Sequence, residues 1–300
     1  MKSLGPRFIT GLVILFLIFV GTRSLVRFLP GDPVQTLLAD SGTALNEVAI
    51  REDLGLDKSF FPALIHDLKQ AAHGDLGISL TTREPIAPLL GFRFLHTLEL
   101  TIASLMLSLL ICIPLGVAAA GRPGGKADRF CDGFGALSSS LPIPWIGPAL
   151  IIVFSIWIHL FPIEKNIALP AVTLAITYSG IWARLIRLRV RETLEVGAAV
   201  GARARGISEW KIGLKYGLAP SSSALVAYFG TQVGVLLGGS FVTEVIFNWP
   251  GLGSLLVDAV LKRDYPIVEY GSFIAAVTCY LGTSSGDYLA HLIQGKRGIA

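Results

Sequence analysis

Charge is scarce in this sequence of 300 residues, of which only 15% is Asp, Glu, Lys or Arg. Ordinary soluble domains carry about 25% charged residues, so the composition excludes that class. Hydrophobic residues instead make up 52% of the chain. The sequence therefore predicts an integral membrane protein.

Cysteine and histidine are also sparse, with three and five residues respectively. The cysteines are odd in number and far apart, which excludes a disulfide framework and a clustered zinc site. The histidines are scattered, and neither an HExxH motif nor a nucleophile elbow stands beside them. We therefore expect no enzymatic activity, no catalytic residues and no metal site in this chain.

A phosphate-binding loop is missing as well. The nearest match, Gly124-Gly125-Lys126-Ala127, has Ala120 where the first glycine belongs and lacks the Ser or Thr that would hold Mg²⁺. We expect this stretch to be a cytoplasmic turn and the chain to bind no cofactor of its own. The net charge of +4 is better explained by Lys and Arg on the cytoplasmic side of a membrane than by binding of nucleic acid.

Six apolar segments are long enough to cross about 30 Å of hydrocarbon as helices, which predicts an all-α fold. They lie near residues 8–29, 98–120, 141–161, 167–187, 222–247 and 270–293. The first segment also resembles a secretory signal peptide, but no Ala-x-Ala-like cleavage site follows it. We expect it to be retained as a span, with Arg23 and Arg27 snorkelling toward the far surface.

Lys and Arg residues are unevenly distributed between the two sides of the membrane if the N-terminus is cytoplasmic. Most of them then lie on the inner side, and the outer ones are diluted over a long loop. The positive-inside rule therefore favours a multi-pass protein of the cytoplasmic membrane with both termini in the cytoplasm.

This topology divides the chain into three regions. Residues 1–29 form an N-terminal transmembrane helix, residues 30–97 an extracytoplasmic region, and residues 98–300 a core of five helices. In the extracytoplasmic region we expect helices near residues 46–54 and 60–72. Their few apolar residues cannot build a separate core, so they should lie on the bundle as a cap.

The inner excursion, about residues 192–220, reads as two short helices broken at Gly206. Alanines favour the first helix, Gly206 can take the left-handed conformation that ends it, and Ser208 is a good N-cap for the second. On composition alone, a basic amphipathic helix lying on anionic lipid is an equally good interpretation.

The fifth span has small residues at regular spacing and an unusual polar content. Gly230, Gly234 and Gly238 recur every four residues, a pattern that lets helices pack closely, either within one subunit or between two. Polar groups in a span are costly unless they face protein or water, which favours a hydrated path with Glu244 near its outer mouth. The candidate path residues on this helix are Gln232, Ser240, Thr243 and Glu244.

Trp249, Pro250 and Gly251 follow the fifth span and cannot continue it as a helix. Two interpretations are equally good. The segment is either a re-entrant turn at an outer gate, or an interfacial tryptophan and a turn of the kind that ends any span.

A specific resemblance begins at the inner excursion. The residues Ala202-Arg203-Ala204-Arg205-Gly206-Ile207-Ser208-Glu209-Trp210-Lys211 resemble the EAA loop of binding-protein-dependent ABC importer permeases, in the form carried by the dipeptide, oligopeptide and nickel permease family. Other stretches match that family in order over nearly the whole chain: Pro30-Gly31-Asp32-Pro33, Leu54-Gly55-Leu56-Asp57, Gly74-Asp75-Leu76-Gly77, Thr97-Leu98-Glu99-Leu100, Ile113-Pro114-Leu115-Gly116, Leu169-Pro170-Ala171, Glu244 to Gly253, and Arg263-Asp264-Tyr265-Pro266.

The resemblance implies a six-helix permease with the fold of type I ABC importers. It implies that Ala202 to Glu209 form a coupling helix that docks on a separate cytoplasmic ATPase. The implied partners are a second, homologous permease, two ATPases that bind ATP and Mg²⁺, an extracytoplasmic binding protein and membrane lipid. Implied cargo is a dipeptide or oligopeptide, with nickel or a metal chelate as the alternative.

Some positions depart from the family pattern. Val200 stands near the place of the acidic residue that names the loop, and Pro220 replaces the usual asparagine after it. A secondary transporter is the more remote alternative, for which we find no internal repeat between the two halves of the chain.

Overall fold

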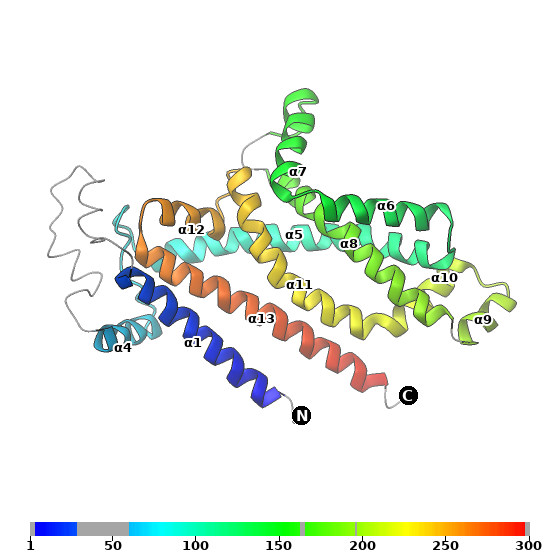
Figure 1. Ribbon diagram of the computed structural model, residues 1–300, viewed down its shortest axis with the longest axis horizontal. Coiled ribbons are helices and arrows are strands. Elements are labelled where there is room, and N and C mark those ends of the chain that lie inside the picture. Colours follow the sequence, from blue (N-terminus) through cyan, green and yellow to red (C-terminus); the bar gives the residue numbers. More distant parts are fainter. Residues whose placement is uncertain (1–3, 29–59, 163–165, 196, 298–300) are drawn as a thin grey trace. The chain divides into compact units, whose positions relative to one another are not determined.

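The computed structural model describes residues 4–28, 60–162, 166–195 and 197–297, and these residues are helical almost throughout (Figure 1). Within them the only strand-like feature is one isolated bridge between Ile78 and Pro85. The elements are α1 (Leu4–Phe28), α4 (Phe60–Ala72), α5 (Ile86–Gly121), α6 (Lys126–Ser140), α7 (Ile143–Leu150), the π-helix η1 (Ile151–Trp157), α8 (Ala168–Leu194), α9 (Gly197–Ala204), α10 (Glu209–Ile212), the π-helix η2 (Gly213–Leu218), α11 (Ala219–Ile246), α12 (Leu252–Leu261) and α13 (Tyr265–Arg297).

Among the described residues, three helical segments are long and apolar enough to cross a membrane. They are α5, α8 and the joined helix of α10, η2 and α11, which runs through 38 residues from Glu209 to Ile246. The pair of α6 with α7 and η1 is bent by 103°, the geometry of either a broken fourth span or a re-entrant loop. Helices also lie over the predicted spans at residues 8–29 and 270–293, but helix length and apolarity do not reproduce the predicted count of six.

The described helices form two compact units. The first takes in residues up to 96 together with residues 250–280, and the second takes in residues 97–249 and those from 281 onward. A buried apolar cluster fills the second unit, with Trp182 and Ile186 of α8, Ile212 of α10 and Leu236 of α11 fully enclosed.

Helix α6 was not expected from the sequence, which predicted only a turn before a span starting near residue 141. The turn is present, since Gly124 has a φ of +73°, but a helix follows it directly. Helix α6 packs along α8 at Gly135 and Gly180, where any side chain would overlap the other helix (Figure 1). The hydroxyl of Ser138 also donates a hydrogen bond of 2.9 Å to the carbonyl oxygen of Ile176.

A buried ion cluster in the first unit corrects the expectation that Arg23 snorkels. Arg23 is only 7% exposed, and its Nη2 lies 2.5 Å from Oδ2 of Asp67 in α4. Its Nη1 lies 3.1 Å from Oε2 of Glu269 in α13. The charge is neutralised inside the protein because carboxylates from two distant parts of the chain reach it, which sequence position alone does not reveal.

The region predicted as a cap is described only from Phe60 onward. Helix α4 occupies Phe60–Ala72, as predicted, and a turn with positive φ at Gly74 and Gly77 follows. The predicted helix near residues 46–54 and the family strings that begin at Pro30 and Leu54 lie outside the described residues.

Candidate functional site

The break predicted at Gly206 is present, with α9 before it and α10 after it. The amide of Ile207 donates to the carbonyl of Ala202 at 3.2 Å, and the amide of Gly206 donates to that of Arg203 at 2.9 Å. These two bonds, with a φ of +73° at Gly206, form a Schellman motif, the glycine-dependent end of a helix. Ser208 occupies the N-cap position of α10, but its side chain makes no capping hydrogen bond.

A bidentate ion pair closes the same turn. Nε of Arg203 lies 2.9 Å from Oε1 of Glu209, and Nη2 lies 3.2 Å from Oε2. The Glu209 carboxylate holds the pKa of Arg203 above its ordinary value, chiefly through this hydrogen bonding. Because both side chains are about one-third exposed, the pair fixes geometry more than it adds stability.

The small residues of α9 seat the loop on the bundle. Ala199 and Ala202 are buried and share the core cluster of the second unit with Leu194 at the end of α8. The side chains that the loop presents outward are different ones: Val200 is 55% exposed and Trp210 is 46% exposed, while Arg205 is also exposed. A close approach to another protein would thus involve these residues rather than the alanine face.

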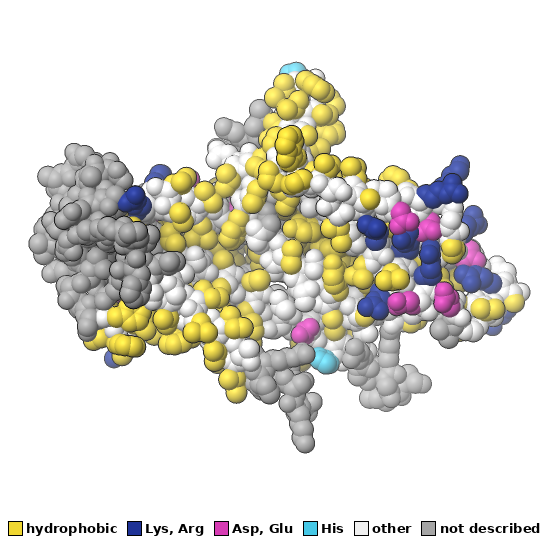
Figure 2. All heavy atoms as spheres, viewed as in Figure 1, with side chains coloured by type: hydrophobic (Ala, Val, Ile, Leu, Met, Phe, Trp, Pro, Cys, Tyr) yellow, Lys and Arg dark blue, Asp and Glu magenta, His cyan; other side chains and the backbone are white. Residues whose placement is uncertain are grey.

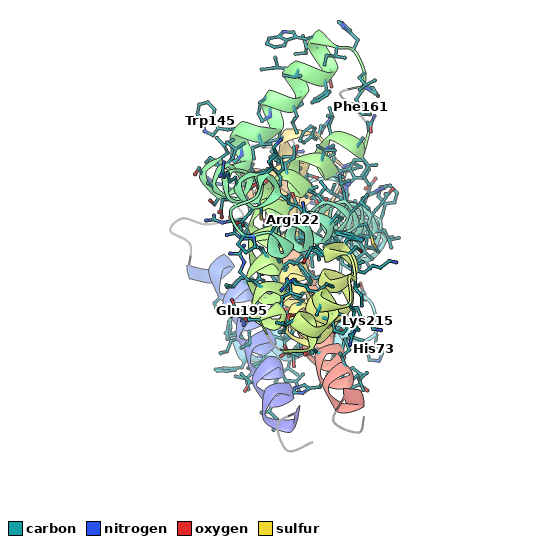
Figure 3. All side chains as sticks on the ribbon, turned by 90° about the vertical axis from the view of Figure 1, so that its right-hand side faces the viewer. His73, Arg122, Trp145, Phe161, Glu195 and Lys215 are labelled. Carbon is teal, nitrogen blue, oxygen red and sulfur yellow. The ribbon has the colours of Figure 1, made fainter. Side chains whose placement is uncertain are left out.

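Charged side chains gather at the end of the second unit that carries this loop (Figure 2). In Figure 3 this end faces the viewer, and Arg122, Glu195 and Lys215 surround it. The loop therefore stands within a polar surface at one end of an otherwise apolar helical unit, as expected of a segment outside the membrane.

Asp128 lies at the centre of an ion network near this end that sequence reasoning missed. Its carboxylate accepts the amide of Gly124 at 2.7 Å, Nη1 of Arg187 at 2.6 Å and Nη2 of Arg191 at 3.1 Å. Arg187 also pairs with Asp132 at 2.6 Å. The signal was present as two acids four residues apart on α6 and two arginines four residues apart on α8, a spacing that puts each pair on one face of its helix.

The three glycines spaced by four residues on α11 have different surroundings. Gly230 meets Gly286 of α13, and a methyl group on either residue would overlap the backbone of the other. Gly234 is buried, whereas Gly238 is exposed and has open space around its Cα. Close packing within this chain is therefore found at Gly230, and packing of Gly238 against a second subunit stays a prediction.

Two of the polar residues predicted to line a path, Gln232 and Glu244, make hydrogen bonds to neighbouring helices. Oε1 of Gln232 accepts a bond of 3.3 Å from the indole of Trp182 in α8. Glu244 is fully buried, and its Oε1 accepts bonds from Thr97 of α5 at 2.7 Å and from Ser240 at 3.3 Å. Gln232 and Glu244 thus lie at two separate contacts along α11, and both contacts hold α11 to the bundle, whereas the hydroxyl of Ser240 makes its hydrogen bonds within α11.

Trp249, Pro250 and Gly251 end the helix as predicted. The amide of Trp249 donates to the carbonyl of Glu244 at 2.8 Å, and the Trp249 side chain is buried. Gly251 then takes the N-cap position of α12, a helix that the sequence analysis did not anticipate. The segment connects two helices, and its role as a gate remains a prediction.

The hydrogen bond between Thr97 and Glu244 gives a direct test of this packing. Thr97→Val keeps the shape and removes the donor, so it should destabilise the chain by about 1–3 kcal/mol. Thr101→Val is the matched control, because the Thr101 hydroxyl is equally buried one turn along α5 and has no hydrogen-bond partner among the described residues. Unfolding in detergent measures both variants, and equal stability of the two would contradict the assignment.

Comparisons with known proteins agree with one another. Residues 112–297 match the protein family described as binding-protein-dependent transport system inner membrane component. The chain is 35% identical over 260 residues to the glutathione transport system permease protein GsiC of Escherichia coli O6:H1, and equally to that of strain K12, with 85% of each chain covered. Among solved structures it resembles a chain of the MetNI methionine ABC transporter in an inward-facing conformation. That chain is 20% identical with a TM-score of 0.61, and the match covers 68% of the present chain and 96% of the other.

Proposed function

We propose that this chain, which belongs to the family of binding-protein-dependent transport system inner membrane components and is a permease subunit of an ABC importer, forms half of a translocation path for peptides. The other half is a second, homologous permease. Two cytoplasmic ATPases bind ATP and Mg²⁺, and an extracytoplasmic binding protein delivers the cargo. Both termini are proposed to lie in the cytoplasm, with α4 on the opposite side.

The loop from Ala202 to Glu209 is the proposed contact with the ATPase. It is supported by its geometry, because a Schellman turn and a bidentate ion pair hold two short helices in one arrangement. A docking element must keep its shape when the partner moves, and α9 is held against α8 by the buried Ala199 and Ala202. We propose that Val200 and Arg205, which are exposed, contact the ATPase.

A peptide is the proposed cargo, since the relatives are named as glutathione permeases and glutathione is a short peptide. Nickel or a metal chelate is the competing cargo. The test is ligand identification on the cognate binding protein, followed by ATPase measurements on the reconstituted complex. Stimulation by the loaded binding protein with a peptide, and none with nickel, supports the proposal, whereas the reverse result replaces it.

Gly206→Pro tests the contact with the ATPase. Proline cannot adopt a φ of +73° and lacks the amide that donates to Arg203, so the turn should be lost and the co-purifying ATPase with it. We expect at least about a tenfold loss of bound ATPase, equivalent to about 1.4 kcal/mol of binding free energy. Quantitative pull-down from membranes measures the change.

Gly201→Ala is the control, since Gly201 lies within α9 and has open space where a methyl group would stand. It should retain the ATPase. If Gly206→Pro binds the ATPase as well as Gly201→Ala does, the loop is not the docking element, and uptake that persists with no ATPase would favour a secondary carrier.

A further inference from the structure

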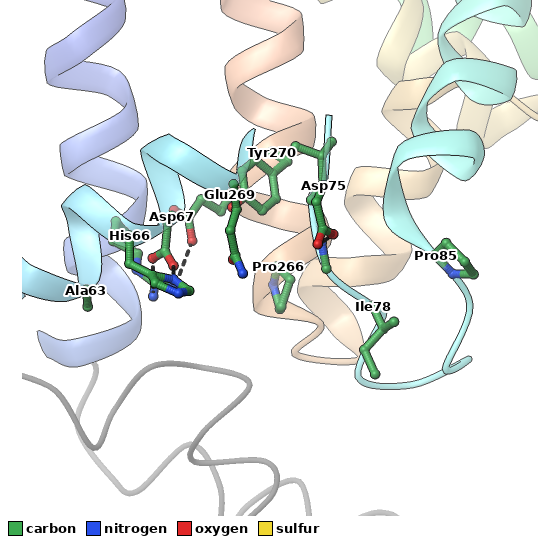
Figure 4. Close-up of a pocket in the computed structure, with 13 residues that line it drawn as sticks. Ala63, His66, Asp67, Asp75, Ile78, Pro85, Pro266, Glu269 and Tyr270 are labelled. Atoms are coloured by element: carbon green, nitrogen blue, oxygen red, sulfur yellow. Dashed lines mark hydrogen bonds and ion pairs between the residues drawn. The ribbon is translucent and has the colours of Figure 1, made fainter. Parts of the chain in front are cut away.

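A pocket of about 520 Å³ lies in the first unit, a volume typical of sites for small molecules (Figure 4). Four segments of the chain form its wall: the C-terminal part of α1, the stretch from α4 through the following turn, Pro85 just before α5, and the start of α13. Its apolar lining comes from Ala63, Leu76, Ile78, Pro85 and Pro266, together with the ring of Tyr270.

The pocket has more negative than positive charge. Among the described residues, three carboxylates line it, from Asp67, Asp75 and Glu269, together with the guanidinium of Arg23 and the exposed imidazole of His66. Figure 4 shows Asp67 and Glu269 together on one side of the pocket and Asp75 on the other. Since Arg23 already pairs with both Asp67 and Glu269, the lining retains an uncompensated negative charge.

One carboxylate oxygen in this lining has neither a hydrogen bond nor an ion-pair contact among the described residues. Glu269 is only 2% exposed. Its Oε2 accepts a hydrogen bond from Nη1 of Arg23, but its Oε1 has no hydrogen-bond partner among the described residues. A buried oxygen without a donor is costly, so its presence beside a cavity points to a ligand that supplies one.

The chemistry of the lining selects among cations. A metal ion fits poorly, because no group of three His, Cys, Asp or Glu in the described ranges is placed to hold one. An ammonium group has three donors and can satisfy separate carboxylates at once. The apolar wall and the face of Tyr270 would accommodate the carbon chain that carries it.

We propose that this pocket binds an alkylammonium group, held by the free oxygen of Glu269 and by Asp75 at its opposite side. Two sources share this chemistry: the α-ammonium group of a peptide and a lysine side chain of a docked protein. The first source rests on the proposed function, since it makes the ligand the cargo of the importer.

The experiment uses the full chain in phosphatidylcholine nanodiscs, without any ATPase, and measures binding of n-butylammonium by calorimetry at neutral pH. Glu269→Gln keeps the side-chain shape and removes the charge, so the dissociation constant should rise about tenfold or more. Asp258→Asn makes the same charge change on the exposed face of α12, away from the pocket, and should leave binding unchanged.

Two further comparisons keep the test decisive if Glu269→Gln does not fold. Asp75→Asn, at an exposed position, should raise the dissociation constant of n-butylammonium about threefold. The wild-type chain should bind n-butylammonium but not the neutral n-butanol. Equal binding of the two molecules, or no effect of either pocket variant, overturns the proposal.

Two peptides distinguish the sources. Binding of Ala-Ala but not of N-acetyl-Ala-Ala, with the same dependence on Glu269, identifies a peptide N-terminus as the ligand. If the chain binds n-butylammonium but does not bind Ala-Ala, the site is supported and its occupant is a lysine side chain. If no ligand binds in any of these measurements, the expected loss of bound ATPase in Gly206→Pro is unaffected, so the two proposals can fail separately.

Discussion

Gly230→Ala should destabilise the chain by about 1–3 kcal/mol, the range typical of overpacked interiors. The added methyl group would overlap the Cα of Gly286, which belongs to the backbone of α13 and cannot rotate away. The two helices must therefore move apart, and the dispersion contacts along their crossing weaken. Unfolding in mixed detergent measures the loss, and the yield of monodisperse protein should fall with it.

Gly238→Ala is the matched control on the same helix and has the opposite expected sign. Gly238 is exposed with open space around it, so the methyl group costs nothing in packing and raises helix propensity by about 0.5–1 kcal/mol. Combining Gly230→Ala with Gly286→Ala should give less than the sum of the single losses, because the first change already separates the helices. Strict additivity, or equal effects at Gly230 and Gly238, would contradict the contact.

Asp128→Ala is expected to cost about 3 kcal/mol, because breaking a largely buried ion network leaves charge without compensation. Asp128 accepts bonds from Arg187, Arg191 and the amide of Gly124, so a single substitution removes all three. Asp132 would remain as the one carboxylate that the structure pairs with Arg187. Thermal unfolding in detergent at low ionic strength measures the change, and α6 should loosen from α8 first, as hydrogen exchange would report.

Glu192→Ala removes an ion pair of the other kind. Glu192 pairs with Arg189 at 3.2 Å, but both side chains are about half exposed, so the loss should stay within about 0.5 kcal/mol. If Asp128→Ala costs no more than Glu192→Ala, the network around Asp128 contributes to the surface charge and not to the attachment of α6.

The sequence predicts best where structure follows from a few neighbouring residues. The break at Gly206 depends on alanines before it and on a glycine at the left-handed position, and the structure has both short helices in place. Helix α4 and the end of α11 at Trp249 are likewise local features. In each case the hydrogen bonds that decide the conformation join residues within about one turn.

Predictions fail where the deciding contact joins distant residues. Arg23 was expected at the membrane surface, but Asp67 and Glu269 neutralise it inside the first unit. Helix α6 was missed because Lys126–Ser140 has few apolar residues, and its packing depends on the glycine contacts with α8. Gly238 has the same spacing as Gly230 but open space around it in this chain, so its packing against a second subunit stays a prediction.

The unbroken helix from Glu209 to Ile246 restricts how its two ends can be displaced. At 1.5 Å per residue, its 38 residues extend about 57 Å, without a flexible joint at Pro220. An axial slip of one residue at Glu209 therefore shifts the Glu244 carboxylate by about 1.5 Å. That shift would lengthen the 2.7 Å bond to Thr97 to about 3.1 Å if it is perpendicular to the bond, and to about 4.2 Å if it lies along the bond, so a slip of several residues requires α5 to move with the helix or this bond to break.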